Sequence, residues 1–326
     1  MTGWPADRRR RVTARFLSLL GALVIFGPYV AGRPAAWAPS VHFFAEATAD
    51  PLQPIGQLTI VTYNIAHGRG TGDWNWGGGS ARDKRERIER IGRDLRQWNA
   101  DIVVLNEVDF DSSWSGRMNQ AAELARLGGF PYYVEQRNFE LQIFLLHWRF
   151  GNAVLSRYPL EQVEAVELPC YARWEQMLAG SKQGLRMTIR LTGDRRCRLF
   201  AVHWEPRDEA TRVASAERLI DEIQSSPDPC ILAGDFNTAP QGAPGYRLTL
   251  QGTNAVDRLL ASGFLRTPDD HREQPSELSF STLDPRVTID WILIPQNWEY
   301  LRYETLDAIH SDHRPVRATV APSAAW

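Results

Sequence analysis

The amino-acid sequence predicts a folded protein of the α/β or α+β class, in which mixed β-sheets carry helices on their outer faces. Of its 326 residues, 43% are hydrophobic and 10% aromatic, a composition typical of globular domains. Short apolar runs rich in β-branched residues are interspersed with longer amphipathic segments. The runs include hairpin-like neighbours, which favours mixed sheets over a regular βαβ repeat.

The first half of the body contains two expected strands and two expected helices. Residues 58–65 (LTIVTYNI) and 101–108 (DIVVLNEV) predict buried strands. Residues 84–99 predict a helix, because apolar residues recur there at three- and four-residue spacing between charges. A second helix is expected at residues 119–127, and the glycine pair after it is a good helix terminator.

The second half contains more strands and one long helix. Strands are expected at residues 152–155, 185–191 and 198–204. Residues 209–224 predict an amphipathic helix, and further strands are expected at residues 230–233, 288–294 and 316–320. The order of the strands within the sheets does not follow from this pattern.

Residues 1–50 form a distinct head. A cluster of arginines (Arg8 to Arg11 and Arg15) precedes an apolar run at residues 16–31, as in an export signal. The run is shorter than the ~20 residues of a usual spanning helix. A cleaved signal, a retained membrane anchor and a buried core helix are the alternatives. We expect an exported or membrane-anchored protein whose catalytic part lies outside the cytoplasm.

The remaining chain is expected to form one monomeric catalytic domain at residues 55–322. Residues 1–49 hold six of the 37 basic residues but only two of the 39 acidic ones, so the rest has a formal charge of −6. Such a domain lacks the broad positive field of non-specific nucleic-acid binders. The three cysteines have no metal-ligand spacing and cannot form a full disulfide framework, although a bridge between Cys170 and Cys197 stays open.

Polar residues recur where apolar runs end, and loops at such places commonly carry function. A single residue of this kind is more often a turn or cap residue, but several at equivalent places point to a shared site. The set comprises Asn64, Glu107, His203, Asp235, Asn237, Asp290, Asp312 and His313.

These residue types suit phosphoester hydrolysis. Mg²⁺, or Mn²⁺ in its place, prefers carboxylate and amide oxygens, which makes Glu107 with Asn64 the candidate metal site. Asp235 suits the activation of water. Asn237, and the imidazoles of His203 and His313, can stabilise phosphoryl oxygens; the imidazoles can be cationic near neutral pH. Asp290 is expected to orient His313.

Six short blocks span nearly the whole body: YNI at 63–65, LNEVD at 105–109, GNAVLSR at 151–157, GDFN at 234–237, IDWI at 289–292 and SDHRPV at 311–316. In this order they resemble the blocks of the endonuclease/exonuclease/phosphatase superfamily, which includes DNase I-like nucleases, neutral sphingomyelinases and inositol-polyphosphate 5-phosphatases. One GDFN block is moderately specific, whereas six in order are very specific.

The resemblance implies a four-layer sandwich of two mixed β-sheets packed face to face with helices outside. It also implies a metal site at Glu107 and Asn64 with Asp312 nearby, and places His203 over the scissile phosphate. Asn152 and Arg212 become candidate substrate-binding residues, although Asn152 could equally shape its loop. Asn106 stands where the family usually has Gln, which puts a neighbouring hydrogen bond in doubt.

The substrate stays open between a nucleic acid, cut by a secreted nuclease, and a phospholipid head group, cut by a sphingomyelinase-like phosphodiesterase. Membrane association through residues 16–31 would suit the second, as would the loop tryptophans (Trp74, Trp76, Trp114 and Trp174) and the apolar run at 141–148. Tryptophans also fill cores. A catalytically inactive binding module is the alternative outside the enzyme class, and it predicts loss of the central acids, all of which are present.

Overall fold

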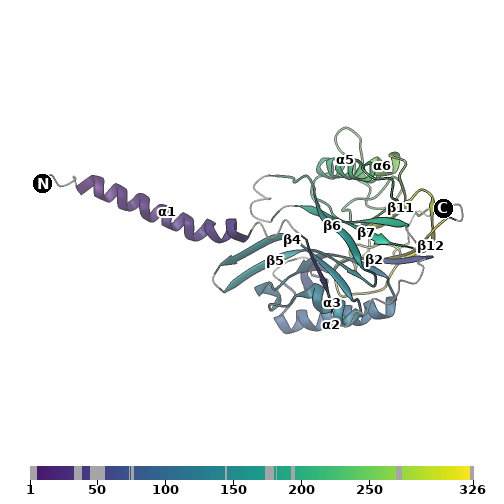
Figure 1. The fold of residues 1–326 in the computed structure, drawn as a ribbon, viewed down its shortest axis with the longest axis horizontal. Helices are drawn as coiled ribbons and strands as arrows, with labels where there is room; N and C mark the ends of the chain where they lie inside the picture. Colours follow the sequence, from purple (N-terminus) through teal and green to yellow (C-terminus); the bar gives the residue numbers. More distant parts are fainter. Residues whose placement is uncertain are drawn as a thin grey trace.

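The computed structural model describes residues 6–32, 39–44, 56–72, 74, 77–143, 145–172, 180, 182–191, 195–268 and 274–323. In these residues two β-sheets pack face to face, and helices cover the outer face of each (Figure 1). The predicted four-layer sandwich of two mixed sheets is confirmed.

The first sheet has, among the described residues, seven strands. In spatial order they are β1 (Ser40–Phe43), β4 (Tyr132–Ile143), β5 (Leu146–Ser156), β3 (Ile102–Asp109), β2 (Leu58–Asn64), β13 (Val316–Pro322) and β12 (Trp298–Thr305). The second sheet has six over the same described ranges: β10 (Leu265–Arg266), β11 (Asp290–Pro295), β9 (Cys230–Asp235), β8 (Arg196–His203), β7 (Gln183–Arg190) and β6 (Leu160–Glu167).

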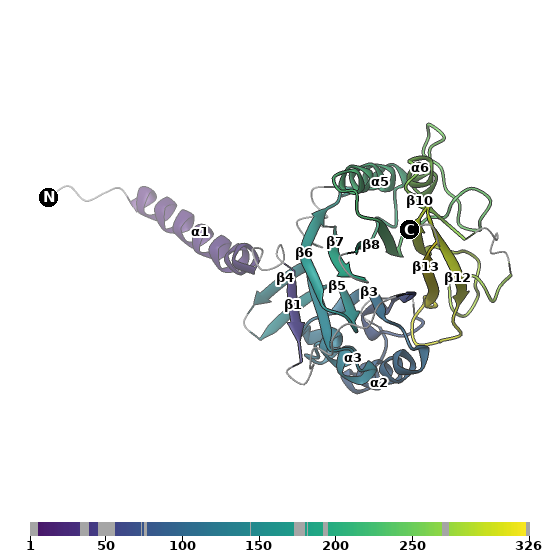
Figure 2. The ribbon, with the colours of Figure 1, turned by 45° about the vertical axis from the view of Figure 1, so that its right-hand side comes forward.

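The helices of the body lie on the two outer faces, as Figure 2 shows. Helices α2 (Ala81–Trp98) and α3 (Gln120–Gly128) bury their apolar sides against the first sheet. Helices α5 (Glu209–Gln224) and α6 (Ala255–Ala261) do the same on the second sheet. Two short 3-10 turns, η2 (Ala66–Gly68) and η3 (Ser113–Ser115), follow β2 and β3. A third apolar cluster fills the space between the sheets.

Each sheet contains one parallel pair of strands joined by a helix, and these pairs position the site. β2 runs parallel to β3 with Asn64 opposite Asn106, and β8 runs parallel to β9 with His203 opposite Asp235. The carboxyl ends of parallel strands meet at one edge of a sheet. The functional residues predicted at four separate strand ends are therefore brought to a common rim.

The strands and helices predicted from apolar patterns are present with shifts of a few residues at their ends. The helix predicted at residues 209–224 coincides with α5. Strands β4, β6 and β12 were not predicted, because charged residues interrupt their apolar residues; each is extended through pairing with the strand that follows it in the chain. The apolar run at residues 141–148 lies at the tip of the β4–β5 hairpin, where Leu145 is 80% exposed.

The apolar run of the head lies in helix α1 (Ala6–Gly32), which extends away from the body (Figure 1). The alternative of a buried core helix is wrong, because large apolar side chains of this helix are exposed: Phe16, Leu17, Leu19, Leu20, Leu23, Val24 and Phe26. In the part of the chain that the structure describes, no helix combines the length and the apolarity needed to cross a membrane.

Candidate active site

A cavity of about 360 Å³ opens at the rim where the strand ends meet. Six of the predicted site residues line it: Glu107, His203, Asp235, Asn237, Asp312 and His313. Two more, Asn64 and Asp290, are buried in direct hydrogen-bond contact with this set. Residues that are up to 249 positions apart in the chain (64 and 313) thus form one cluster.

Asp235 lies at the centre of the cluster. Its Oδ2 accepts a hydrogen bond from the Asn64 amide at 3.1 Å and lies 3.7 Å from the Nε2 atoms of both His203 and His313. Its Oδ1 accepts the backbone N–H of Asn237 at 2.9 Å. Burial raises the pKa of the Asp235 carboxyl above its usual value, although the two histidines oppose the shift. A raised pKa makes this carboxylate a better proton acceptor.

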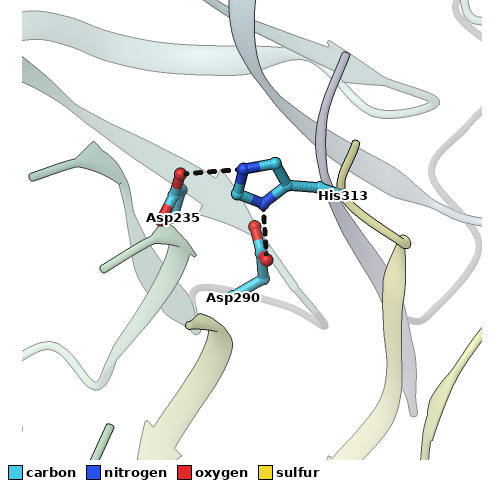
Figure 3. A group of neighbouring side chains, drawn as sticks. All are labelled: Asp235, Asp290 and His313. Carbon is cyan, nitrogen blue, oxygen red and sulfur yellow. Dashed lines mark hydrogen bonds and ion pairs between the residues drawn. The ribbon is translucent and has the colours of Figure 1, made fainter. Parts of the chain in front are cut away.

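His313 and Asp290 form a buried pair beside Asp235 (Figure 3). The Nδ1 of His313 lies 2.9 Å from Asp290 Oδ2, which fixes the ring so that Nε2 faces Asp235. Burial alone lowers the pKa of His313, but the carboxylates of Asp290 and Asp235 outweigh it and raise the pKa to about 10. His313 is therefore a cation near neutral pH. The three side chains lie close enough together to hold a metal ion. Since the Nδ1 of His313 is already hydrogen-bonded to Asp290, we assign Asp235, Asp290 and His313 to charge stabilisation and proton transfer and not to metal binding.

His203 does not carry the positive charge that its imidazole could have near neutral pH. Burial, together with the nearby ammonium group of Lys182, lowers the pKa of His203 to about 4, in spite of Asp235 and Glu107. Its imidazole is neutral near neutral pH and can still form a hydrogen bond to a phosphoryl oxygen. Charge counting along the sequence missed this, because burial penalises a cation that water would otherwise solvate.

Glu107 and Asp312 form the acidic side of the cavity, and Arg69 bridges them. The guanidinium of Arg69 donates from Nη1 to Glu107 Oε2 at 2.9 Å and from Nη2 to Asp312 Oδ2 at 2.5 Å. The Asn64 amide donates to the other oxygen of Glu107 at 3.2 Å. Burial opposes ionisation, but His67, His203 and Arg69 hold the pKa of Glu107 well below its usual range. Glu107 is therefore ionised.

This acidic side fits the divalent ion that the sequence implies. Two carboxylates and an amide supply hard oxygen ligands of the kind that Mg²⁺ prefers. One cationic group, the Arg69 guanidinium, already contacts both Glu107 and Asp312, so their oxygens face a common point. The Oδ1 of Asn64 accepts the backbone N–H of Ala66 at 3.0 Å, and its role as a metal ligand stays a prediction.

The backbone is strained where it presents these groups. Glu107, Asn237 and His67 have positive φ angles of 53°, 53° and 54°. Non-glycine residues adopt this region rarely, and such strain gathers at functional sites. At Gly234 the φ angle is +150°, and a Cβ atom there would lie 1.9 Å from the carbonyl oxygen of Val202. The GDFN block therefore needs glycine so that β9 can lie close to β8 beside Asp235.

Four residues near the cavity were missed by the sequence analysis: Arg69, His67, Asp109 and Lys182. The Nδ1 of His67 lies 2.9 Å from buried Asp109, and its Nε2 lies 3.5 Å from Glu107 Oε2. For His67, Arg69 and Asp109 the only signal in the sequence is that they follow predicted strand ends within a few residues, in the segments NIAHGR and NEVD. Lys182 instead lies three residues before the strand predicted at residues 185–191, and nothing in the sequence marked it.

Asn152 and Arg212, the predicted substrate-binding residues, lie outside this cavity. Asn152 is completely buried, accepts a hydrogen bond from the Asn106 amide at 2.9 Å and donates to Gln136 at 2.9 Å. Its position favours the role of shaping the site over contact with substrate. Arg212 is 1% exposed and forms an ion pair with Glu209 at 2.8 Å. Its contacts hold the start of α5 in place.

Asn106, the departure from the family pattern, links the two sheets. Its Oδ1 accepts the backbone N–H of Asp235 at 3.0 Å, and its amide donates to the carbonyl of Val202 at 3.0 Å. The shorter amide therefore forms hydrogen bonds through both its oxygen and its nitrogen and anchors Asp235 at the end of β9.

The loop tryptophans that the sequence offers for membrane contact lie in different environments. Trp114 lines the cavity, whereas Trp74 is 72% exposed. Trp76 and Trp174 lie outside the described residues. In the described residues no disulfide is present, so the bridge between Cys170 and Cys197 that the sequence left open is absent.

Solved structures share this fold. An endonuclease/exonuclease/phosphatase from Beutenbergia cavernae DSM 12333 matches with a TM-score of 0.59 and 20% identity over 82% of this chain and 72% of that chain. A mannosyl-6-phosphatase from Bacteroides thetaiotaomicron VPI-5482 matches with a TM-score of 0.58 and 15% identity over 81% and 99%. Sphingomyelinase C from Streptomyces griseocarneus gives 0.52 and 19% over 81% and 99%. At these identities the likeness is one of fold.

Sequence comparison identifies the family. A search among curated proteins finds no match to the chain. The model of the Endonuclease/Exonuclease/phosphatase family matches residues 61–313, a span that contains every predicted site residue. The chain therefore belongs to the endonuclease/exonuclease/phosphatase family, whose members are generally phosphoester hydrolases.

Proposed function

We propose that this protein is a divalent-metal-dependent hydrolase in which Asp235 activates water for attack on a phosphoester. One observation carries the proposal: a proton acceptor, a cationic imidazole and two ionisable oxygen ligands from distant strand ends line a single cavity. Each has a role that the reaction needs. An inactive binding module has no use for this arrangement.

In the proposed reaction, Asp235 holds the attacking water and accepts one of its protons as the water oxygen bonds to phosphorus. The ester P–O bond breaks, and the departing oxygen is protonated by solvent. His313, held by Asp290, and the Asn237 amide stabilise the charge on the phosphoryl oxygens. Glu107 and Asp312 would hold Mg²⁺ or Mn²⁺, which would supply charge neutralisation at the phosphoryl group.

The test is hydrolysis of a substrate panel by the full chain in Mg²⁺: DNA, RNA, sphingomyelin, phosphoinositides and bis-p-nitrophenyl phosphate. We expect EDTA to remove activity and added Mg²⁺ or Mn²⁺ to restore it. Asp235→Asn should lower turnover by about 10²–10⁴-fold. Asp221→Asn, on the exposed side of α5, is the matched control. Activity that survives EDTA contradicts metal dependence, and near-normal turnover of Asp235→Asn removes the proposed base.

We also propose that the catalytic body is exported, as a secreted or membrane-anchored enzyme. The exposed apolar side chains of α1 and the preceding arginines support this location. The test is cell fractionation with protease accessibility of the full chain. Replacing Leu19 and Leu23 by arginine should retain the protein in the cytoplasm. Finding the unaltered chain in the cytoplasmic fraction contradicts export.

A further inference from the structure

Part of the cavity wall is aromatic and has no role in the proposed reaction. His67, Trp114 and Phe150 line the cavity beside Glu107. They come from three separate places: the turn after β2, the turn after β3, and β5. We call these three residues the aromatic wall. Lys182 and Arg207, which also line the cavity, supply positive charge for a phosphate.

The rings of the aromatic wall pack against one another. The centroid of His67 lies 5.1 Å from that of Trp114 and 5.5 Å from that of Phe150, and Trp114 lies 6.0 Å from Phe150. These separations are those of aromatic pairs in direct contact. The planes of Trp114 and Phe150 are inclined by 32°, whereas His67 meets Trp114 at 55° and Phe150 edge-on at 86°. Trp114 and Phe150 therefore form the surface on which a flat ring can lie, with buried His67 at its edge.

Buried groups behind the wall hold its rings in place. The indole N–H of Trp114 donates to Asp109 Oδ2 at 2.6 Å, and the other oxygen of Asp109 contacts His67. Phe139 stacks on Phe150 at 5.4 Å with an interplanar angle of 25°. Trp114 and Phe150 are nevertheless only half-buried. Buried contacts hold the ring orientations, and the partly exposed Trp114 and Phe150 line the cavity, where a ligand can contact them.

We propose that the aromatic wall is a subsite for a flat ring, the nucleobase of a nucleotide whose phosphate lies at His313 and Asn237, in the same cavity as Glu107. A base stacks on a fixed aromatic surface through its π face, without requiring a particular sequence. The inference rests on the proposed function and selects a substrate class for it.

A choline head group is a poorer match to this geometry. Quaternary ammonium groups are bound within cages of aromatic rings that surround the cation. In the aromatic wall the rings touch each other, so no methylated ammonium group can be enclosed by them. The nucleotide is therefore the occupant that the ring arrangement favours.

The experiment compares three esters with the same p-nitrophenol leaving group: thymidine 5′-(p-nitrophenyl phosphate), methyl p-nitrophenyl phosphate and p-nitrophenyl phosphorylcholine. For the unaltered full chain in Mg²⁺, we expect kcat/KM for the thymidine ester to exceed that for the methyl ester by about tenfold to a hundredfold. Trp114→Leu and Phe150→Leu should reduce this ratio, chiefly by raising KM for the thymidine ester.

Two controls separate stacking from the integrity of the fold. Trp114→Phe keeps an aromatic ring but removes the bond to Asp109, and should retain most of the ratio. Trp74→Leu makes the same replacement at an exposed tryptophan that does not line the cavity, and should leave the ratio unaltered. If Trp114→Phe lowers the ratio of kcat/KM values as much as Trp114→Leu does, the hydrogen bond to Asp109 and not the ring surface is responsible, and the subsite is overturned.

Equal kcat/KM values for the thymidine and methyl esters, or preference for the phosphorylcholine ester, also overturn the subsite while leaving the proposed hydrolase intact. Failure to hydrolyse any of the three esters counts against the hydrolase instead. Calorimetric titration with thymidine 5′-monophosphate and with methyl phosphate then tests the subsite without turnover. The subsite is supported if thymidine 5′-monophosphate binds more tightly than methyl phosphate and Trp114→Leu removes this difference. Equal affinity of the unaltered chain for the two ligands refutes the subsite.

Discussion

Replacing Arg69 by methionine should destabilise the metal-free protein, because it leaves Glu107 and Asp312 without the cation that bridges them. Removing one partner of a buried ion pair costs ~3–5 kcal/mol. The Glu107 side chain is 23% exposed, so solvent screens its charge and the loss in the free energy of unfolding should be at the lower end of this range, about 3 kcal/mol. For a domain of this size that corresponds to a fall in Tm of roughly 6–12 °C.

Divalent ions should reverse much of this loss, since they neutralise the same two carboxylates. The assay is thermal unfolding of Arg69→Met and the unaltered chain in EDTA and in saturating Mg²⁺, with Mg²⁺ affinity measured by calorimetry. We expect the gap in Tm to narrow in Mg²⁺. The variant should bind the ion roughly tenfold more tightly, because a neighbouring positive charge is gone.

A neighbouring arginine supplies the matched control. Arg87→Met removes a guanidinium that donates to the carbonyl of Gly68 at 2.8 Å and should leave Mg²⁺ affinity unaltered. Equal Tm values in EDTA for Arg69→Met and the unaltered chain, or a gap that Mg²⁺ does not narrow, would refute the assignment of Arg69 as the cation that holds the two acids together.

The remaining predictions concern the residues that hold the catalytic strand. Gly234→Ala should lower the free energy of unfolding in urea by about 3 kcal/mol or more, because its Cβ meets the Val202 carbonyl; a smaller loss contradicts the close strand approach. The His313 pKa is raised in the folded state, so its stabilisation is complete below pH ~6.5 and is lost as the pH rises through about 10. In EDTA, the stability difference between the unaltered chain and His313→Asn should therefore shrink over that range, and a difference independent of pH refutes the shift. Asn106→Ala should lower the free energy of unfolding by about 1–3 kcal/mol for each buried group left unpaired, and turnover should fall because Asp235 loses its backbone anchor. Urea unfolding measures the first effect and steady-state kinetics the second. A variant with unaltered stability and turnover contradicts the role of Asn106 as an anchor.

Local patterns in the sequence were enough to predict the class of the fold and most of the residues that line the candidate site. Core strands such as β2 and β9 are continuous apolar runs, and α5 has helical spacing, so local pattern suffices to predict them. Asp235, Glu107 and His313 were found because each stands at the end of such a run, in a motif whose residue types match the chemistry.

Features that depend on contacts between separate elements are visible only in three dimensions. Strands β4, β6 and β12 are extended because the strand that follows each of them in the chain pairs with it, not because of an apolar pattern of their own. His203 is neutral because burial and Lys182 penalise its charge, which no count of charges along the chain reveals. Arg69 reaches Glu107 and Asp312 across 38 and 243 positions of sequence. Such contacts are set by chain folding in three dimensions, and the order of residues alone does not encode them in any local pattern.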